Sequence, residues 1–472
     1  MKSASATNQD RGVLGRAEVV VVGGGLAGVA AAVAAARNGA DTILVERSQM
    51  LGGVATAGLM ASITNFYYTA KNELVVGGIA TEVVQRLADA GAAPTDWRDR
   101  SCPHFTNDPE AFKTLLIDMC LEAGVRTLLD TWAVGAIGDG PTLKGIFVET
   151  KGGRFSLYGQ TLIDAGGDAE LAVWAGAPYH EDAARASLEF RMGNVDLEQL
   201  FRYFRDNPDE YPTAKDVPQS LEEVERHWRG RGYLFVPHGA GRQMKLVQEA
   251  KRRGELPDAV GLAVGLDALG MYGIAATGTA VINANFENGD ALDPWLRSQF
   301  ILDARRSVPV VVEFLRRNMP GFANAHLVAT ASEIGVRGTR WLDGAVVLRE
   351  EDILSGRRFP DAVGMAPYRK VIDGLLQWLP HAADIPYGVM LPKGVEGLLV
   401  ASGKSASTQP RGELRGQSRC MQLGEAAGTA AAMCAAQGCT PRQLDVRALQ
   451  RRLLEQGVFL GDEALLRERG LA

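Results

Sequence analysis

The chain has 472 residues, which is too long for one ordinary domain and predicts two or three interleaved ones. Hydrophobic residues make up 46% of the chain, which excludes general disorder. Its 50 basic and 56 acidic side chains give a net charge of −6 without a long basic block, which argues against nucleic-acid binding. The scattered cysteines form no C-x-x-C pair, so we expect no disulfide framework, no metal and a reducing, cytoplasmic location. They are Cys102, Cys120, Cys420, Cys434 and Cys439.

Residues 1–16 are polar and aperiodic, so we expect a flexible tail without the apolar centre of a secretory signal. The apolar stretch 19–36 is interrupted by glycines and is therefore not a membrane span. The elements predicted there, in chain order, are a β-branched strand at 19–22, a glycine-rich turn at 23–28, an alanine-rich helix at 29–38 and a strand at 42–45 that ends in Glu46.

The turn after the first strand has the pattern G-x-G-x-x-G. Gly23 permits a tight turn, Gly25 lets backbone amides approach a pyrophosphate, and Gly28 lets the helix and the strand pack closely. The start of the helix supplies oriented N–H groups and about half a positive charge for the phosphates. Glu46 can accept hydrogen bonds from both ribose hydroxyls of an adenosine. The arrangement predicts a dinucleotide site without separating FAD from NAD. A glycine-rich turn that binds nothing is the alternative.

A second glycine pair, Gly52-Gly53, stands in the segment 47–58, where a nicotinamide dehydrogenase normally passes to its next helix. The pair suits a loop that contacts the ribityl and ring portion of a longer cofactor, which favours FAD. An ordinary surface turn is the alternative. Further on, an amphipathic helix is predicted from Asp108 to Glu122 and a strand at 126–134, whose tail offers backbone groups around Val134 to an adenine edge.

The last part of the chain completes the predicted cofactor domain. A meander at 145–149 and 155–157 and buried strands at 161–164 and 397–401, both followed by glycines, are predicted. The helix predicted at 417–437 aims its positive end at the flavin N1 and C2 carbonyl. Its two glycines are expected to pack closely on the cofactor or the sheet; they are Gly424 and Gly428.

The middle segment, 183–384, is richer in charged and aromatic side chains and is expected to supply the substrate chamber, with a helix at 294–318. A flavin takes hydride at N5 while a nearby side chain moves the proton. The candidates for contact with the substrate are His238, Tyr272, Arg337, Tyr387, Arg411 and Glu413. A lone histidine is more often structural, Arg337 either clamps an anion or fixes the domain junction, and the loop charges Arg411 and Glu413 face either substrate or solvent.

Several strings of the sequence together resemble the glutathione-reductase-like FAD-dependent oxidoreductases. More narrowly they resemble a bacterial FAD-dependent oxidoreductase family whose N-terminus reads G-G-G-x-A-G…E…G-G-x-A-T-x-G. The matching segments are 23–28, Glu46, 52–58, 334–337, 350–357, 385–387, 391–401 and 420–428. The resemblance spans nearly the whole chain and implies an α/β fold in which a Rossmann-like FAD-binding domain with a parallel sheet is interrupted by a mixed α+β substrate domain.

The resemblance divides the chain into four parts: a tail at 1–16, the first part of the FAD-binding domain at 17–182, the substrate domain at 183–384 and the second part of the FAD-binding domain at 385–472. Family members often carry histidines in the loop after the last strand, where this chain has Thr408 and Arg411 but keeps Arg415. No histidine stands near the second glycine pair, so we expect FAD to be bound non-covalently. The expected cofactor-binding residues are Gly23, Gly25, Leu26, Ala27, Gly28, Glu46, Arg47, Gly52, Gly53, Val54, Thr56, Val134, Ala165, Gly166, Gly403, Arg415 and Gln417.

These features predict an FAD-dependent oxidoreductase that transfers hydride between a small polar or cyclic metabolite and flavin N5, as a dehydrogenase, desaturase or reductase. No second strand–G-x-G-x-x-G–helix unit is evident, so a transient donor or acceptor, oxygen or the substrate itself must exchange the electrons. A flavin monooxygenase or halogenase-like enzyme that uses an external reductant and O2 is the main alternative. A nucleic-acid-modifying flavoprotein and a non-catalytic flavin-binding module stay open as less favoured alternatives. We expect no membrane or nucleic-acid partner, and a homodimer stays open.

Overall fold

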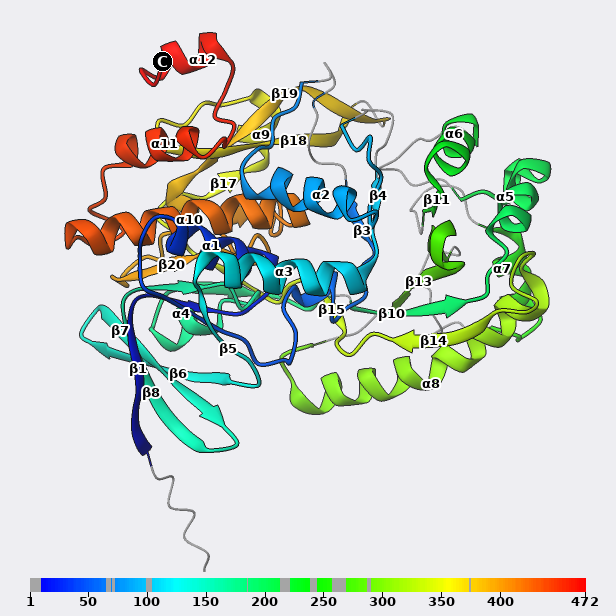
Figure 1. The fold of residues 1–472 in the computed structure, drawn as a ribbon, viewed down its shortest axis with the longest axis horizontal. Coiled ribbons are helices and arrows are strands. Elements are labelled where there is room, and N and C mark those ends of the chain that lie inside the picture. Colours follow the sequence, from blue (N-terminus) through cyan, green and yellow to red (C-terminus); the bar gives the residue numbers. More distant parts are fainter. Residues whose placement is uncertain are drawn as a thin grey trace, which may run out of the picture.

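The structure is a computed structural model, and it describes residues 10–64, 69, 73–98, 104–184, 186–212, 221–237, 244–256, 269–286, 290–372 and 375–472. Two units stand side by side (Figure 1). One combines both ends of the chain, and the other is formed by its middle part. Of the helices in these described ranges, none is both long enough and apolar enough to cross a membrane.

The first unit is built on a seven-stranded sheet. Its order is β5-β2-β1-β8-β7-β6, with β20 beside β8. The strands β5, β2, β1, β8 and β20 run parallel, and β7 and β6 continue from β8 as an antiparallel meander. The strands are β1 (Asp10–Val22), β2 (Thr42–Val45), β5 (Arg126–Leu128), β6 (Trp132–Asp139), β7 (Thr142–Thr150), β8 (Gly153–Asp164) and β20 (Leu398–Val400). The loops that follow the parallel strands therefore meet at one edge of the sheet.

The strand β1 is longer than its sequence indicates. Its second half is the predicted β-branched strand, which is buried on both faces. Its first half begins at Asp10, so the prediction of a flexible tail is wrong for residues 10–16, which pair with β8 up to Arg16–Tyr158. The side chains of this part are mostly exposed, and backbone pairing therefore holds it in place without an apolar pattern.

A layer of helices covers one face of this sheet. The helices α1 (Leu26–Arg37) and α10 (Gln417–Gln437) pack against each other, and both contact strands of the sheet. A Cβ on Gly424 would stand 2.1 Å from the Ala27 carbonyl oxygen, and one on Gly428 would stand 2.0 Å from that of Ala31. These glycines therefore pack on α1, and not on the cofactor or the sheet as we expected. The other helices of this unit are α2 (Ile79–Asp89), α3 (Pro109–Ala123), α4 (Glu170–Trp174), α9 (Glu350–Ser355), α11 (Val446–Glu455) and α12 (Glu463–Glu468).

The second unit is an antiparallel sheet packed against helices. Its order is β11-β12-β13-β10-β14, with β15 beside β10. Its long helix, α8 (Pro294–Asn318), runs beneath β14 and β10 in Figure 1, and the apolar face of β10 packs on α8. The strands are β10 (Ala186–Gly193), β11 (Tyr233–Val236), β12 (Gly270–Ile274), β13 (Thr279–Phe286), β14 (His326–Thr330) and β15 (Gly335–Val336). The helices are α5 (Leu197–Asp206), α6 (Leu221–Arg231), α7 (Lys245–Arg252) and α8 (Pro294–Asn318), the last with the predicted bounds.

The remaining strands form four two-stranded sheets outside the two large ones, β3–β4, β9–β16, β17–β21 and β18–β19. They are β3 (Ser62–Thr64), β4 (His104–Thr106), β9 (Tyr179–Glu181), β16 (Arg340–Leu342), β17 (Leu348–Arg349), β18 (Ala362–Ile372), β19 (Leu375–Pro386) and β21 (Thr408–Gln409). The single-turn helices are η1 (Gly53–Ala55), η2 (Pro208–Glu210), η3 (Ala275–Thr277) and η4 (Tyr387–Met390). The hairpin β18–β19 packs in the core of the first unit, so the second core, which also includes Leu59 and Ala61, extends from residue 184 to 336 and not to 384. We therefore place the boundary near Val336.

The predicted strand 126–134 is two strands. β5 ends at Leu128 and β6 begins at Trp132. Between them Asp130 has φ +51°, a conformation that ends extended pairing. The backbone N–H of Asp130 and that of Thr131 instead donate to the Ser48 and Glu46 carbonyls at 3.1 Å each. This turn therefore holds the end of β5 against the end of β2.

Candidate functional site

The first glycine turn joins β1 to α1 at the carboxyl edge of the sheet. Gly23 has φ +99°, and a Cβ there would stand 2.7 Å from the Ala165 carbonyl carbon. At Gly28 a Cβ would stand only 1.7 Å from the Gly23 carbonyl oxygen, so glycine is required for the helix to start so close to the strand. At Gly25, in contrast, a Cβ would meet no heavy atom within 4 Å. The turn is therefore tight where it packs on protein and open where we expect a pyrophosphate.

The helices α1 and α10 differ from the others at their N-terminal ends. The N-caps of both are glycines, no side chain bonds their first turns there, and neither first turn holds an acidic residue. Aspartates cap α3, α5, α8, α11 and α12, and Glu425 and Asp164 accept hydrogen bonds from the first turns of α2 and α4. Helix N-termini attract anions because their N–H groups lack partners within the helix. The start of α1 therefore fits a pyrophosphate.

Glu46 ends β2 beside this turn. Its Oε2 accepts a hydrogen bond from the Gly24 N–H at 2.5 Å, and its Oε1 accepts one from the Ser48 N–H at 2.8 Å. The side chain is buried, and its own N–H donates to the Leu128 carbonyl at 2.8 Å. Each carboxylate oxygen keeps a second acceptor direction, so the predicted contact with ribose hydroxyls is compatible with this geometry.

The second glycine loop lies directly against the first. The Gly52 N–H donates to the Gly24 carbonyl at 2.7 Å. Gly52 and Gly53 have φ values of +105° and +54°, and a Cβ on Gly53 would stand 3.3 Å from the Gly25 Cα. The Thr56 hydroxyl donates to the Leu51 carbonyl and thereby closes the loop. Both glycine loops therefore line one continuous backbone surface.

Other predicted cofactor residues border this surface. Val134 is the extra residue of a β-bulge, since the β6–β7 register passes from Ala133–Val148 to Gly135–Phe147. Bulges free backbone groups from the ladder, as contact with an adenine edge requires. Arg47 pairs with Glu333 at 2.8 Å and stands 5.6 Å from the Trp132 ring.

The ends of β8 and β20 and the start of α10 complete the edge. Ala165 and Gly166 follow β8 directly beside Gly23. A Cβ on Gly403 would stand 2.1 Å from the Leu414 carbonyl oxygen, which fixes the loop before α10. On the first turn of α10, Gln417 Oε1 and Ser418 Oγ are buried without a hydrogen-bond partner in the described structure. Buried polar atoms normally have partners, so these atoms fit a bound polar group such as a flavin.

A strap formed by residues 332–340 crosses the junction between the two units. The Ser332 N–H donates to the Ala57 carbonyl at 2.9 Å, and the Thr339 N–H donates to Asp168 at 2.9 Å. Lys404 Nζ donates to the Val336 carbonyl at 3.3 Å. Arg337 is therefore held at the junction, and its charge acts on Glu189 of β10 and on Arg415 before α10.

The structure separates the remaining catalytic candidates. Tyr387 is buried in the core of the first unit, and its hydroxyl donates to the Pro441 carbonyl at 3.0 Å. Glu413 accepts a hydrogen bond from Lys370 at 2.8 Å. Arg411 donates to the Ala183 carbonyl at 2.6 Å and pairs with Asp182 at 3.3 Å. All three side chains have protein partners. His238 lies outside the described residues.

Two buried polar residues beside Tyr272 escaped sequence reasoning. Glu189 and Asn283 are directly paired across β10 and β13, and the Asn283 amide donates to the Tyr272 hydroxyl at 3.3 Å. Burial raises the pKa of Glu189 to about 8, although the Arg337 charge lowers it. Burial also raises the pKa of Tyr272 far above its usual range. The only sequence signal was the alternation of apolar and polar residues along 186–193.

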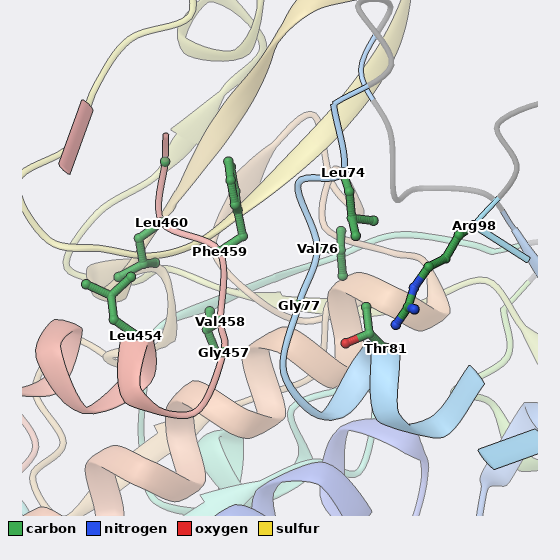
Figure 2. Close-up of a pocket in the computed structure, with 11 residues that line it drawn as sticks. Leu74, Val76, Gly77, Thr81, Arg98, Leu454, Gly457, Val458, Phe459 and Leu460 are labelled. Atoms are coloured by element: carbon green, nitrogen blue, oxygen red, sulfur yellow. The ribbon is translucent and has the colours of Figure 1, made fainter. Parts of the chain in front are cut away.

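Two cavities lie outside this arrangement. Figure 2 shows one of about 300 Å³ between the segments 74–81 and 454–461, which is apolar apart from Thr81 and the Arg98 guanidinium. Another, of about 460 Å³, is lined by Trp341, His180 and the loop that carries Arg411. Neither includes a residue of the glycine turns. Within the described ranges, no group of three or more His, Cys, Asp or Glu side chains could hold a metal ion.

Comparison with known families gives one match over most of the chain. The model of the family described as FAD dependent oxidoreductase matches residues 18–453. Among curated proteins, the digeranylgeranylglycerophospholipid reductase of Methanocaldococcus jannaschii is 29% identical over 184 residues, which are 38% of this chain and 46% of that protein. The reductase 1 of Methanococcoides burtonii is 25% identical over 204 residues, or 40% of this chain and 47% of that protein. The match thus spans less than half the length of these relatives.

Solved structures with similar folds are more distant. A geranylgeranyl bacteriochlorophyll reductase-like protein from Thermoplasma acidophilum has a TM-score of 0.44 and 13% identity, with 96% of this chain and 84% of that chain covered. A myxobacterial chondrochloren halogenase has a TM-score of 0.45 and 12% identity, with 93% and 79% covered. Similarity at this level carries no information about a substrate.

Proposed function

Because the chain belongs to the FAD dependent oxidoreductase family, whose model matches residues 18–453, we propose that it transfers hydride between a small polar or cyclic metabolite and N5 of its FAD. One observation supports this proposal above the others. The two glycine loops and the uncapped starts of α1 and α10 lie along one edge of the sheet. On the polar face of the second sheet, Arg191 of β10 pairs with Asp108 and Glu110 of the first unit. A long nucleotide fits the first surface, and a substrate fits between the two units.

The residues proposed to hold FAD are those of the sequence prediction. The turn at Gly23–Gly28 faces the pyrophosphate, Glu46 the ribose, and the bulge at Val134 the adenine. The loop Gly52–Thr56 and the start of α10 at Gln417 face the ribityl and ring portions. When bound, FAD supplies a two-electron acceptor or donor at N5. Non-covalent binding stays a prediction.

The residues of the chain position the substrate and exclude water. The strap 332–340 covers the second glycine loop through the Ser332–Ala57 hydrogen bond, and it places Arg337 between the two units. The Glu189–Asn283–Tyr272 group on the facing sheet can hold or move a proton at the Glu189 carboxyl. The hydride and the proton of the proposed reaction would thus be handled by opposite walls of one chamber.

Electron exchange with a third component is part of the proposal. The sequence has one G-x-G-x-x-G unit between a strand and a helix, which the FAD site uses, so no separate nicotinamide domain is proposed. A transient electron donor or acceptor, or oxygen, exchanges electrons with the flavin instead. The narrower glutathione-reductase-like grouping, a homodimer and a cytoplasmic location stay predictions.

The test is anaerobic mixing of the yellow holoenzyme with a panel of small polar and cyclic metabolites, watched by absorbance for bleaching of the oxidised flavin. We expect at least one compound to reduce the flavin, and reoxidation to release its oxidised product. If no compound does so, while a prereduced sample exposed to O2 forms a C4a-oxygen adduct in stopped flow, the monooxygenase or halogenase-like alternative replaces this proposal. Holoenzyme whose flavin never changes redox state with any partner would make the protein a binding module.

A further inference from the structure

The larger of the two cavities outside the glycine turns has a volume of about 460 Å³, and three segments meet at it. They are the paired strands β9 and β16, the connection 343–349 and the loop 407–411. The parallel pair β17–β21 joins the last two, with Leu348 opposite Thr408. Ligand pockets have volumes of about 300–1,000 Å³, whereas one water takes up roughly 30 Å³ in the liquid. The cavity is therefore large enough for a small organic molecule.

Two residues that line the cavity each have a buried polar atom without a hydrogen-bond partner among the described residues. These atoms are Thr408 Oγ1 and Arg411 Nη1, and Thr408 is only 1% exposed. Arg411 is anchored through its other terminal nitrogen, Nη2, which donates to the Ala183 carbonyl at 2.6 Å and lies 3.3 Å from Asp182. A guanidinium nitrogen can only donate, and a hydroxyl can donate as well as accept. Both atoms therefore suit a ligand that supplies hydrogen-bond acceptors.

The walls of the cavity carry an excess of positive charge. The permanently charged side chains of the lining are Arg349, Lys393, Arg411 and Asp343, and His180 adds no negative charge. Lys393 and Asp343 form an ion pair at 2.8 Å, and Arg411 pairs with Asp182, whose side chain is 63% exposed. Arg349 donates to the neutral Gln409 side chain and has no ion pair within the described ranges. One cation of the lining thus has no anionic partner there, and an anion would be attracted to it.

The rest of the cavity wall is largely apolar and aromatic. Its apolar side chains are Trp341, Leu342, Val347 and Pro410. The His180 ring stacks on the Trp341 ring with the centroids 5.2 Å apart, and the Arg411 guanidinium carbon stands 5.7 Å from the centre of the same Trp341 ring. The cationic and the aromatic parts of the wall are therefore adjacent. A molecule that has both an anionic group and an apolar body would contact both parts.

We propose that this cavity binds a small organic anion. Its oxyanion group, a carboxylate or a phosphate, accepts hydrogen bonds from Arg349, Arg411 and the Thr408 hydroxyl, while its apolar body lies against Trp341. Both kinds of oxyanion accept several hydrogen bonds and carry the charge that the walls attract. An inorganic ion would fill only part of the volume and leave the apolar wall without a contact. The lining includes no residue of the glycine turns, so this ligand binds in addition to FAD and the inference does not depend on the proposed function.

The experiment measures the binding of four probes to the holoenzyme by isothermal titration calorimetry: benzoate, phenyl phosphate, inorganic phosphate and benzyl alcohol. We expect at least one of the two organic anions to bind once per chain and at least about 10-fold more tightly than benzyl alcohol, which forms no charge-assisted hydrogen bonds. The organic anion that binds more tightly identifies the oxyanion as carboxylate or phosphate. Binding of neither organic anion, or equal binding of benzyl alcohol, would overturn the inference. Inorganic phosphate that binds more tightly than both organic anions would overturn it as well.

Two arginines locate the bound probe. Arg349→Gln removes the cation without an ionic partner and should weaken binding of the organic anion by about 10- to 100-fold. Arg411→Gln should weaken it by a similar factor, and Arg411→Lys should restore part of the affinity. Arg317→Gln is the matched control, because the Arg317 side chain is 74% exposed on α8. Unchanged affinity in both Arg349→Gln and Arg411→Gln would overturn the inference.

The Thr408 hydroxyl provides a test that a folding defect would not imitate. Because Oγ1 has no partner in the described structure, Thr408→Val should leave the urea midpoint of the protein without probe unchanged or raise it. The same variant should weaken binding of the organic anion by about 2- to 10-fold. Thr440→Val is the matched control, because Thr440 Oγ1 is also buried without a partner there, but Thr440 does not line the cavity. A lowered midpoint with unchanged affinity in Thr408→Val, or an equal loss of affinity in Thr440→Val, would overturn the inference.

Discussion

The two glycines Gly25 and Gly28 allow the cofactor contact to be separated from the packing contact. They stand three residues apart in one turn, and both would be replaced by alanine. At Gly25, φ is −65° and ψ is −179°, which alanine adopts without strain, and the new methyl group meets no protein atom within 4 Å. At Gly28, the methyl group would stand 1.7 Å from the Gly23 carbonyl oxygen.

The expected magnitudes differ accordingly. In Gly25→Ala the stability of the protein without FAD should change by less than about 1 kcal/mol, since the loss of a glycine N-cap and the gain in chain stiffness oppose each other. The methyl group would occupy the space from which phosphate oxygens reach the first N–H groups of α1. Two lost charge-assisted hydrogen bonds, at about 1.5–3 kcal/mol each, weaken FAD binding by about 10²- to 10⁴-fold. In Gly28→Ala the helix must move from the strand, which costs about 1–3 kcal/mol of stability before any cofactor is added.

The measurement is urea unfolding of both apoproteins by circular dichroism, followed by FAD titration with flavin fluorescence as the readout. The expected pattern is a normal unfolding midpoint with lost FAD binding for Gly25→Ala, and a lowered midpoint for Gly28→Ala. Wild-type FAD affinity in Gly25→Ala would refute the placement of the pyrophosphate. A midpoint that falls equally in both variants would refute the distinction between open and packed positions.

Three further predictions test the packing around the site. Tyr387→Phe removes a hydroxyl that donates to the Pro441 carbonyl at 3.0 Å, so we expect the free energy of unfolding to fall by about 1 kcal/mol and the rate of flavin reduction to stay unchanged. Slower flavin reduction at unchanged stability would instead indicate that Tyr387 acts in the reaction. Gly428→Ala would place a Cβ 2.0 Å from the Ala31 carbonyl oxygen and should lower the unfolding free energy by about 1–3 kcal/mol, whereas Gly230→Ala in α6, where the Cβ meets no atom within 4 Å, should not lower it. Burial raises the pKa of Glu425 from 4.5 to about 8. Between these pH values Glu425 is protonated in the folded chain and ionised in the unfolded chain. The contribution of Glu425 to the free energy of unfolding therefore falls as the pH rises from 4.5 to about 8. Glu425→Gln should therefore gain stability relative to the wild type from pH 5 to pH 9 in urea titrations, and a constant difference would contradict this.

The parts of the site that could be predicted are those that are local in the sequence. The strand, the glycine turn and Glu46 fall within 19–46, so turn chemistry and periodicity alone locate them, although α1 begins at Leu26 instead of 29 and β1 extends back to Asp10. The helix α10 also has its predicted bounds. Its partner was not predictable, because a glycine pair one turn apart indicates a close approach without saying to what. The structure gives that partner as α1, with the carbonyls of Ala27 and Ala31 at the contact.

The catalytic candidates show a different limit. Tyr387 stands in a segment that matches the resembled family, and Arg411 and Glu413 stand between the last predicted strand and the helix at 417–437, but position in the sequence does not fix the direction of a side chain. Tyr387 turns into the core and the two charged residues find partners in other segments. Arg337 was chosen from a string of the same kind, and the strap places it at the junction because its neighbours bond to both units.

Glu189, which sequence reasoning missed, lies on a strand whose residues alternate between apolar and polar. In β10 the residues 186, 188, 190 and 192 are apolar and pack in the core with α8, which alone would suggest that the alternate positions face water. Glu189 occupies one of these positions and is nevertheless 2% exposed. Alternation of apolar and polar residues along a strand cannot distinguish a polar face that contacts solvent from one that is covered by another unit of the chain. What distinguishes them is the free-energy cost of the polar atoms left without partners, which a water, an ion or a bound polar group would offset. An alternating strand whose polar face is buried at a domain junction therefore marks a position at which to test for a bound polar group.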